Sequence, residues 1–194
     1  MRRPARHAAL TAAAACVAVA ALSLGLAPLP VRAASVSDNG QAFLEYEVKA
    51  AFVLQLLGFV EWPDATAPGD TITVGVVGDG PMSAALATLH GERSGRRVVA
   101  VRQAAGTVPP PRCQVLYLNG AEAFRTGAAW RAAVGRGVLT IADQPGFAGA
   151  GGMVNLVVVD GRVGLEINPA AAARAGVKIS SKVMRLARIV PGGE

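Results

Sequence analysis

Short β-branched runs alternate with helix-forming segments through the middle of the sequence, and this alternation restricts the folds that the chain can adopt. Four runs rich in valine, isoleucine, leucine and threonine predict buried strands over 71–77, 97–101, 114–118 and 138–142. Two helices are predicted between them, over 82–89 and 121–134. Strands that alternate with helices in this way form a parallel sheet covered on both faces.

The pattern changes after Asp143, where a glycine-rich loop over 144–152 begins. Beyond this loop, Asp160-Gly161 is the strongest two-residue signal for a β-hairpin. Two strands and two helices complete the prediction, over 153–159, 162–167, 169–175 and 180–189. Because no internal repeat or domain linker interrupts the chain, we predict a single three-layer α/β domain. Its sheet is mostly parallel, is flanked by helices, and ends in a late antiparallel hairpin.

A long helix is predicted ahead of the first strand, over 42–60, with Asp38 as its cap. Glu45 and Lys49 are four residues apart and can support this helix by an ion pair. The second half of the helix is apolar nearly all round, so it is either buried on several sides or covered by a partner. Trp62 at its end is a candidate anchor for a partner, and packing in the core is the alternative.

The first 33 residues have the organisation of a secretory signal. Three arginines stand at the start, an apolar stretch rich in alanine and leucine runs over 8–26, and the small residues Val31 and Ala33 follow. We predict that residues 1–33 are a cleaved signal peptide and that 34–194 is the exported, periplasmic domain. A retained membrane anchor is the alternative. Export argues against functions that need cytoplasmic ATP or NAD.

Loss of the signal peptide changes the charge and the cysteine count. The whole chain has 19 basic and 13 acidic residues; four arginines and no acid leave with the signal, so 15 basic and 13 acidic residues remain, a net charge of +2. This small excess gives nucleic-acid binding no general electrostatic support. Cys113 is then the only cysteine, so it cannot form an intramolecular disulfide. It is either buried or forms a bridge between chains.

The sequence contains no residue set typical of a catalytic or metal site. His90 is the only histidine of 34–194, and one histidine with one cysteine offers too few ligands for zinc. Glu166, on the second strand of the hairpin, has no second carboxylate with which to form an acid–base pair. We therefore predict a non-enzymatic protein without cofactor or metal. An exported hydrolase that uses Glu166 is the least favoured alternative.

A glycine-rich turn at 78–80 follows a predicted strand and precedes a predicted helix, which is where nucleotide-binding loops lie. Ser83 occupies the position of the third glycine of the dinucleotide motif, and no P-loop lysine follows. A tight turn between strand and helix is therefore the alternative to a phosphate site. Any small ligand would still bind near this edge of the sheet. The candidate ligand-loop residues are Gly78, Asp79, Gly80, Gly151 and Gly152.

The helix predicted over 180–189 is amphipathic. Four basic residues fall within about a third of its circumference, given the helical repeat: Lys178, Lys182, Arg185 and Arg188. An ordinary solvated helix face is one interpretation, and a surface for an acidic partner or an anionic membrane is the other. Together with Trp62, these four residues form the candidate partner surface.

Several segments, in their order and spacing, resemble one known family. The first are Tyr46-x-x-Lys49-Ala50-Ala51-Phe52 and Phe59-Val60-Glu61-Trp62-Pro63, and the later ones are 74–79, 138–143, 147–155, 166–168 and 178–187. Together they resemble the YfiR/HmsC family of periplasmic proteins over residues 46–190. The resemblance implies a non-enzymatic periplasmic regulator.

Members similar to YfiR bind the periplasmic sensor part of an inner-membrane diguanylate cyclase and hold it inactive, and an outer-membrane lipoprotein can draw them off. The resemblance thus implies control of cyclic-di-GMP, and hence of biofilm and exopolysaccharide. Such proteins are often dimeric and carry disulfides. A homodimer is therefore expected, but Cys113 has no second cysteine in 34–194 for a redox switch. A periplasmic small-ligand sensor is the alternative function.

Overall fold

The computed structural model describes residues 38–104 and 110–191, except for some side chains within 38–42 and 126–134. The predicted signal peptide, 1–33, lies outside the described residues. The strands are β1 (Val60–Glu61), β2 (Thr71–Val77), β3 (Arg93–Ser94), β4 (Arg97–Gln103), β5 (Val115–Leu118), β6 (Leu139–Ala142), β7 (Val154–Val159), β8 (Arg162–Ile167), β9 (Lys178–Ile179) and β10 (Arg188–Ile189). The helices are α1 (Asp38–Leu57), the short 3-10 helix η1 (Asp64–Thr66), α2 (Met82–Ala87), α3 (Ala121–Thr126), α4 (Ala128–Val134), α5 (Pro169–Arg174) and α6 (Ser181–Met184).

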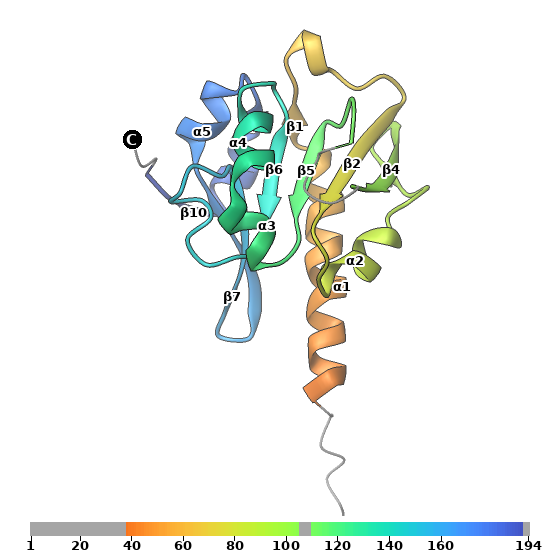
Figure 1. The fold of residues 1–194 in the computed structure, drawn as a ribbon, viewed down its shortest axis with the longest axis vertical. Helices are drawn as coiled ribbons and strands as arrows, with labels where there is room; N and C mark the ends of the chain where they lie inside the picture. Colours follow the sequence, from red (N-terminus) through yellow and green to blue (C-terminus); the bar gives the residue numbers. More distant parts are fainter. Residues whose placement is uncertain (1–37, 105–109, 192–194) are drawn as a thin grey trace, which may run out of the picture. The chain divides into compact units, whose positions relative to one another are not determined.

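Eight of these strands form one sheet in the order β10-β8-β7-β6-β5-β2-β4-β3 (Figure 1). The strands from β4 to β7 in this order run parallel, and β8 returns antiparallel to β7. Asp160 and Gly161 join β7 to β8 with φ of 50° and 71°, the positive values that a tight primed turn requires. These findings confirm the predicted α/β fold with a mostly parallel sheet and a late hairpin.

The order of the strands creates a switch point. The chain leaves β2 for β4 on one side, and then crosses back to β5 on the other side of β2. In open α/β sheets, the carboxyl ends of the strands on either side of such a reversal flank the usual ligand-binding crevice. The fold therefore directs attention to the loops after β2 and β5.

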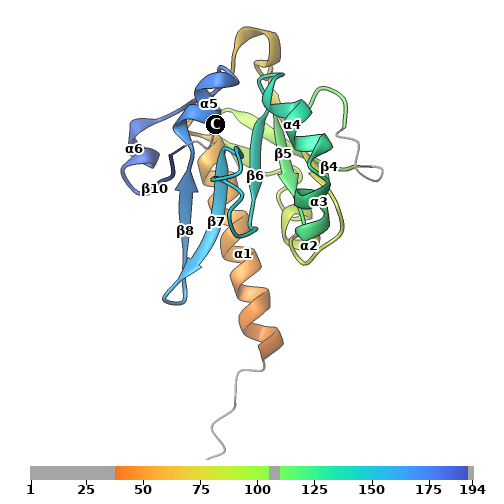
Figure 2. The same cartoon turned by 60° about the vertical axis from the view of Figure 1, so that its left-hand side comes forward.

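Helices cover both faces of the sheet (Figures 1 and 2). One face carries α1 and α2, and its core includes Val53, Leu57 and Tyr117, each at most 1% exposed. The opposite face carries α3 and α4, where Trp130 and Phe147 pack edge to face with their ring centroids 5.4 Å apart. Side chains alternate along each strand, so each strand contributes residues to the cores on both faces, as expected for buried parallel strands.

The structure corrects three predicted helices. The helix expected over 121–134 is two helices, because Gly127 takes a left-handed conformation with φ of 65°. Residues other than glycine adopt this left-handed conformation only with strain, so the break depends on glycine. The long first helix begins at Asp38 and ends at Leu57 rather than Val60, and the side chain of Asp38, the predicted cap, lies outside the described residues. Val60 instead starts β1, which pairs with β9.

The helix expected over 180–189 is also wrong beyond its first turn. Ser180 caps α6 by accepting a hydrogen bond from the backbone N–H of Lys182 at 3.3 Å, but α6 ends at Met184. The chain then forms β10, which pairs with the exposed edge of β8, and the N–H of Val190 donates to the carbonyl of Ile167 at 2.8 Å. Pairing with an open strand edge satisfies backbone groups that a longer helix would leave on β8.

Candidate functional site

The turn after β2 is fixed by a buried asparagine that follows β5. Asn119 is 2% exposed, and its side-chain amide donates to the carbonyl of Gly80 at 3.0 Å and to the hydroxyl of Ser83 at 2.7 Å. A Cβ atom at Gly80 would overlap the Asn119 amide, and Gly78 has φ of 86°. Gly80 is thus required for the close approach of Asn119, and Gly78 for the positive φ of the turn. The sequence analysis missed Asn119, although a polar residue directly after a buried strand is a usable signal.

A pocket of about 340 Å³ opens beside this turn, at the switch point of the sheet. Its lining includes the carboxylate of Asp79 and the amides of Gln103 and Asn119, and Gln103 donates to the carbonyl of Gly78 at 3.1 Å. Among the described lining residues there is no lysine or arginine to pair with a phosphate. The lining therefore favours a neutral or cationic ligand over a nucleotide, in agreement with the missing P-loop lysine.

The second predicted glycine loop does not join this pocket. Gly151 lies against Trp130, and Gly152 packs so closely on Phe147 that a Cβ atom there would overlap the ring. Both glycines thus serve the core beneath α3 and α4. Of the candidate ligand-loop residues, Gly78 and Asp79 line this pocket, and Gly80 lies in the same turn, where Asn119 bonds to it.

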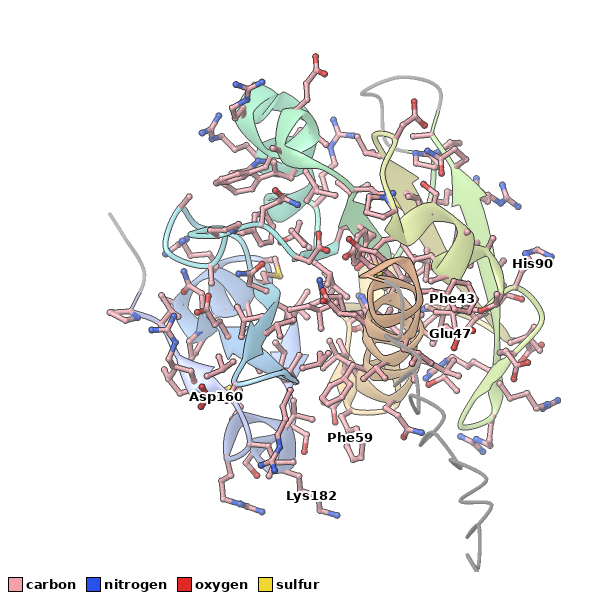
Figure 3. The ribbon with its side chains drawn as sticks, turned by 90° about the horizontal axis from the view of Figure 1, so that it is seen from below. Phe43, Glu47, Phe59, His90, Asp160 and Lys182 are labelled. Carbon is pink, nitrogen blue, oxygen red and sulfur yellow. The ribbon has the colours of Figure 1, made fainter. Side chains whose placement is uncertain are left out.

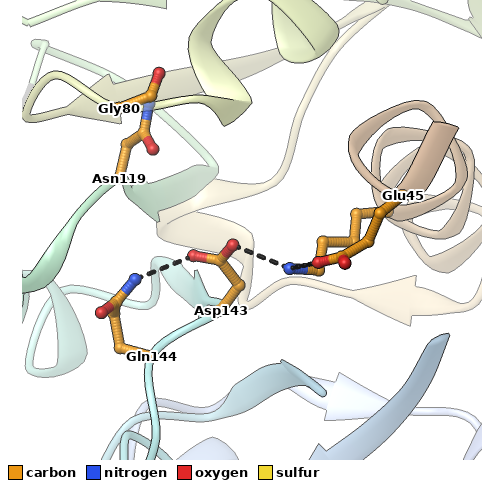
Figure 4. Close-up of polar contacts among 6 residues, drawn as sticks. Glu45, Gly80, Asn119, Asp143 and Gln144 are labelled. Atoms are coloured by element: carbon orange, nitrogen blue, oxygen red, sulfur yellow. Dashed lines mark hydrogen bonds and ion pairs between the residues drawn. The ribbon is translucent and has the colours of Figure 1, made fainter. Parts of the chain in front are cut away.

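A second polar group at the same edge joins α1 to the end of β6 (Figure 4). The ammonium of Lys49 donates to Asp143 at 3.0 Å and contacts Glu45 at 2.7 Å, and Gln144 donates to the other oxygen of Asp143 at 3.1 Å. Burial acts to lower the pKa of Lys49, but Glu45 and Asp143 outweigh it and hold that pKa above its ordinary value. The pair between Glu45 and Lys49 follows from their spacing, whereas Asp143 could not be assigned to it from the sequence.

Tyr117 lies fully buried in β5, and its hydroxyl has no hydrogen-bond partner among the described residues. Burial raises the pKa of Tyr117 strongly, and the nearby negative charge of Asp143 adds to the rise. Lys49 also lies 5.2 Å from the centre of the Tyr46 ring. These groups form a network that holds α1 to the sheet, and the hydroxyl stays protonated at neutral pH.

The basic residues of the candidate partner surface lie on separate elements rather than on one helix. Lys178 is in β9 opposite Glu61, Lys182 is in α6, and Arg185 directly follows α6. All three basic side chains are exposed, and Lys182 extends from the molecule in Figure 3. Leu186 beside them is 85% exposed. These exposed residues therefore include three cations and one large apolar side chain, but the prediction that they lie on one helix was wrong.

Arg188 has a structural partner. Its guanidinium forms an ion pair with Glu166 on the neighbouring strand β8. Asn155 on β7 donates to the same carboxylate at 3.2 Å, so Glu166 is buried and bonded from both sides. This arrangement attaches β10 to the sheet and leaves Glu166 no access to a substrate.

Trp62, the fifth candidate, lies in the core. It is 8% exposed, and its indole N–H donates to the carbonyl of Gln114 at 2.8 Å. Cys113, which directly precedes Gln114 in the sequence, is free and buried. Burial raises the pKa of its thiol. A protonated, buried thiol is a poor nucleophile and a poor partner for a bridge between chains.

The remaining chemistry-bearing residues form no further centre. His90 is exposed, and its Nδ1 accepts a hydrogen bond from the backbone N–H of Val101 at 3.2 Å. Within residues 38–104 and 110–191, no three histidine, cysteine or acidic side chains gather as a metal site would require. None of the helices in this part of the chain has the length and hydropathy of a membrane span.

A known protein family matches most of the described chain. The YfiR/HmsC-like family matches residues 46–188. This range includes every element of the described chain from β1 to α6. In general, proteins of this family are periplasmic, non-enzymatic regulators of cyclic-di-GMP signalling. Because the match covers well over half of the sequence and confirms the resemblance found there, the chain belongs to the YfiR/HmsC-like family.

Proposed function

We propose that this protein binds the periplasmic sensor part of an inner-membrane diguanylate cyclase and holds the enzyme inactive, which lowers cyclic-di-GMP and biofilm formation. The family match over residues 46–188 is the observation that carries this proposal. An outer-membrane lipoprotein that competes for the regulator would release the cyclase.

The mechanism is a shift of population between two states of the cyclase. A regulator inhibits only to the extent that it binds the inactive state more tightly than the active state. A hundredfold difference in affinity corresponds to about 2.7 kcal/mol in favour of the inactive state. The regulator needs no chemistry of its own, and its contact surface determines the outcome.

The exposed basic residues around α6 are the best candidates for this contact. Lys178, Lys182 and Arg185 have no ion pair among the described residues, and Leu186 beside them is exposed. An exposed leucine next to Arg185 in the chain, on a surface with other exposed cations, fits a partner with an apolar anchor and acidic neighbours. Trp62 directly follows β1 and is buried in the core. Because β1 pairs with β9, which contains Lys178, Trp62 supports this region from beneath.

The test is the cellular level of cyclic-di-GMP after deletion of the gene and its restoration on a plasmid. We expect a rise on deletion that the natural gene reverses. A gene that encodes Leu186→Ser with Lys182→Glu should fail to reverse it, whereas Arg136→Glu, a charge reversal at an exposed site remote in sequence, should succeed. No rise on deletion, with export verified, would contradict the proposal.

A second function, a small-ligand sensor, is favoured by the pocket at the switch point. Its ligand would be neutral or cationic and would contact Asp79 and Gln103. A ligand that binds only the folded state raises the melting temperature, so a metabolite panel in a thermal-shift assay detects it. The Asp79→Asn variant should lose the shift for a cationic hit. Deletion without effect on cyclic-di-GMP, together with such a hit, would favour the sensor.

A further inference from the structure

A long apolar trough lies between α1 and the β7–β8 hairpin. Two cavities form it, one of about 640 Å³ and one of about 310 Å³, and they adjoin because Phe52 and Val163 line both. Cavities of this size are typical of small-molecule sites. In Figure 2, the hairpin and the N-terminal half of α1 extend from the sheet in the same direction. The trough therefore has two long walls.

The exposed apolar surface of the described chain is concentrated on this trough. Gln55 supplies the only polar side chain among the described residues that line the smaller cavity. Five of the eight large apolar side chains that are exposed in the described chain line one of the two cavities: Leu44, Val48, Phe59, Val158 and Leu186. The lining is therefore suited to hydrocarbon.

The length of the trough follows α1. The larger cavity is lined by α1 from Leu44 to Phe52, and the lining of the smaller one continues to Leu56 and Phe59. At a rise of 1.5 Å per residue, Leu44 and Leu56 are about 18 Å apart along the helix axis. One acyl chain spans half the hydrocarbon thickness of a bilayer, about 15 Å. The trough therefore matches a single acyl chain in length.

The charges of the larger cavity favour a negatively charged head group. Glu45 lines this cavity, but its carboxylate is 2.7 Å from the ammonium of Lys49, a cation that it shares with Asp143. Arg162 at the start of β8 lines the same cavity, is exposed, and has no ion pair within the described part of the chain. Asp160 in the hairpin turn is exposed and lines neither cavity. Arg162 is thus the cation of this lining that is available to an anion.

We propose that the trough binds one long-chain fatty acid, with the hydrocarbon tail in the smaller cavity and the carboxylate at the hairpin end, paired with Arg162. Each buried CH₂ group strengthens binding about fourfold, so the tail supplies most of the affinity. The ion pair is exposed to solvent and adds only about two- to fivefold. The proposal concerns the protein alone, so it does not rest on the proposed control of a cyclase.

Isothermal titration calorimetry of the purified protein with decanoate and dodecanoate, each below its micellar concentration, tests the tail. We expect one molecule per chain and a dissociation constant about 15-fold lower for dodecanoate, when both added CH₂ groups are buried. Dodecylamine, which has the same tail and a cationic head, should bind more weakly than dodecanoate. Affinity that does not depend on chain length, or tighter binding of dodecylamine, would overturn the proposal. Binding seen only above the micellar concentration would overturn it as well.

The variant Arg162→Gln tests the head group. Its affinity for dodecanoate should fall about two- to fivefold, whereas its affinity for uncharged dodecanol should not change. Arg174→Gln removes an exposed arginine of α5 that lines neither cavity, and it should leave the binding of dodecanoate unchanged. Equal losses in the two variants would show that overall charge attracts the ligand, and would overturn the pairing with Arg162.

Thiol labelling locates the ligand. Val158 and Val159 are both exposed, but of the two only Val158 lines the trough, since successive residues of a strand point to opposite faces. Dodecanoate at ten times its dissociation constant should slow maleimide labelling of Val158→Cys about tenfold and leave that of Val159→Cys unchanged. The natural protein, in which Cys113 is buried, gives the background rate. Equal protection of both variants, or none of Val158→Cys, would overturn the site and leave the trough to a helix of another protein.

Discussion

Lys49 holds the first helix to the sheet, and its replacement by methionine should measurably destabilise the protein. The side chains of Lys49 and Asp143 are 7% and 8% exposed, so loss of the ammonium leaves a nearly buried carboxylate without its charge partner. Breaking a buried pair in this way costs about 3–5 kcal/mol. Gln144 still donates to Asp143, so we expect the lower end, about 3 kcal/mol.

Glu45 contributes much less to this network. Its side chain is 37% exposed, and an exposed pair is worth at most about 1 kcal/mol. Glu45→Gln is therefore the matched control for Lys49→Met, because it removes one charge of the same network on its solvent-exposed side. A double variant, Lys49→Met with Asp143→Leu, should recover most of the loss, since no uncompensated charge remains.

Urea unfolding of the purified protein measures these differences, and thermal unfolding checks them. For a domain of this size, 3 kcal/mol corresponds to a fall in melting temperature of about 6–12 °C. A loss below about 1 kcal/mol for Lys49→Met would show that water screens the pair as on an ordinary surface. A double variant no more stable than the single one would refute the argument from the buried charge.

Three further predictions concern the core, the stability of the fold at alkaline pH and the break between α3 and α4. Trp130→Ala should cost about 3–5 kcal/mol in the free energy of unfolding, because the ring is 2% exposed and packs on Phe147. Tyr117→Phe should be neutral or stabilising at pH 7, since the hydroxyl has no partner, and should flatten the loss of stability above about pH 10. The sign follows from linkage: the unfolded tyrosine ionises near pH 10 while burial keeps the folded one protonated, so each further pH unit favours unfolding by up to about 1.4 kcal/mol. Gly127→Ala should cost about 1–2 kcal/mol by chemical denaturation, because φ is 65°, a left-handed conformation that strains alanine.

The sequence predicted the centre of the sheet better than its edges, for a physical reason. The strands at 71–77 and 162–167 match to the residue, because β-branched runs and the Asp160-Gly161 turn act locally. The two-residue strands at 60–61 and 188–189 have no periodicity to detect, and their pairing depends on partners far along the chain. The same limit hid the partners of Asn119 and Asp143, which only the assembled sheet brings to their contacts.

The first helix illustrates what a sequence pattern leaves open. Its apolar second half indicated either burial on several sides or cover by a partner, and the structure buries Val53 and Leu57 of this half against the sheet. Leu44 and Val48, in the first half of the helix, are exposed instead. An exposed leucine and valine in a helix fixed to the core by Lys49 gain nothing by local rearrangement, since the buried ion pair would be lost with it. Nothing among residues 38–104 and 110–191 covers this apolar surface, and its removal from water in a contact would be favourable.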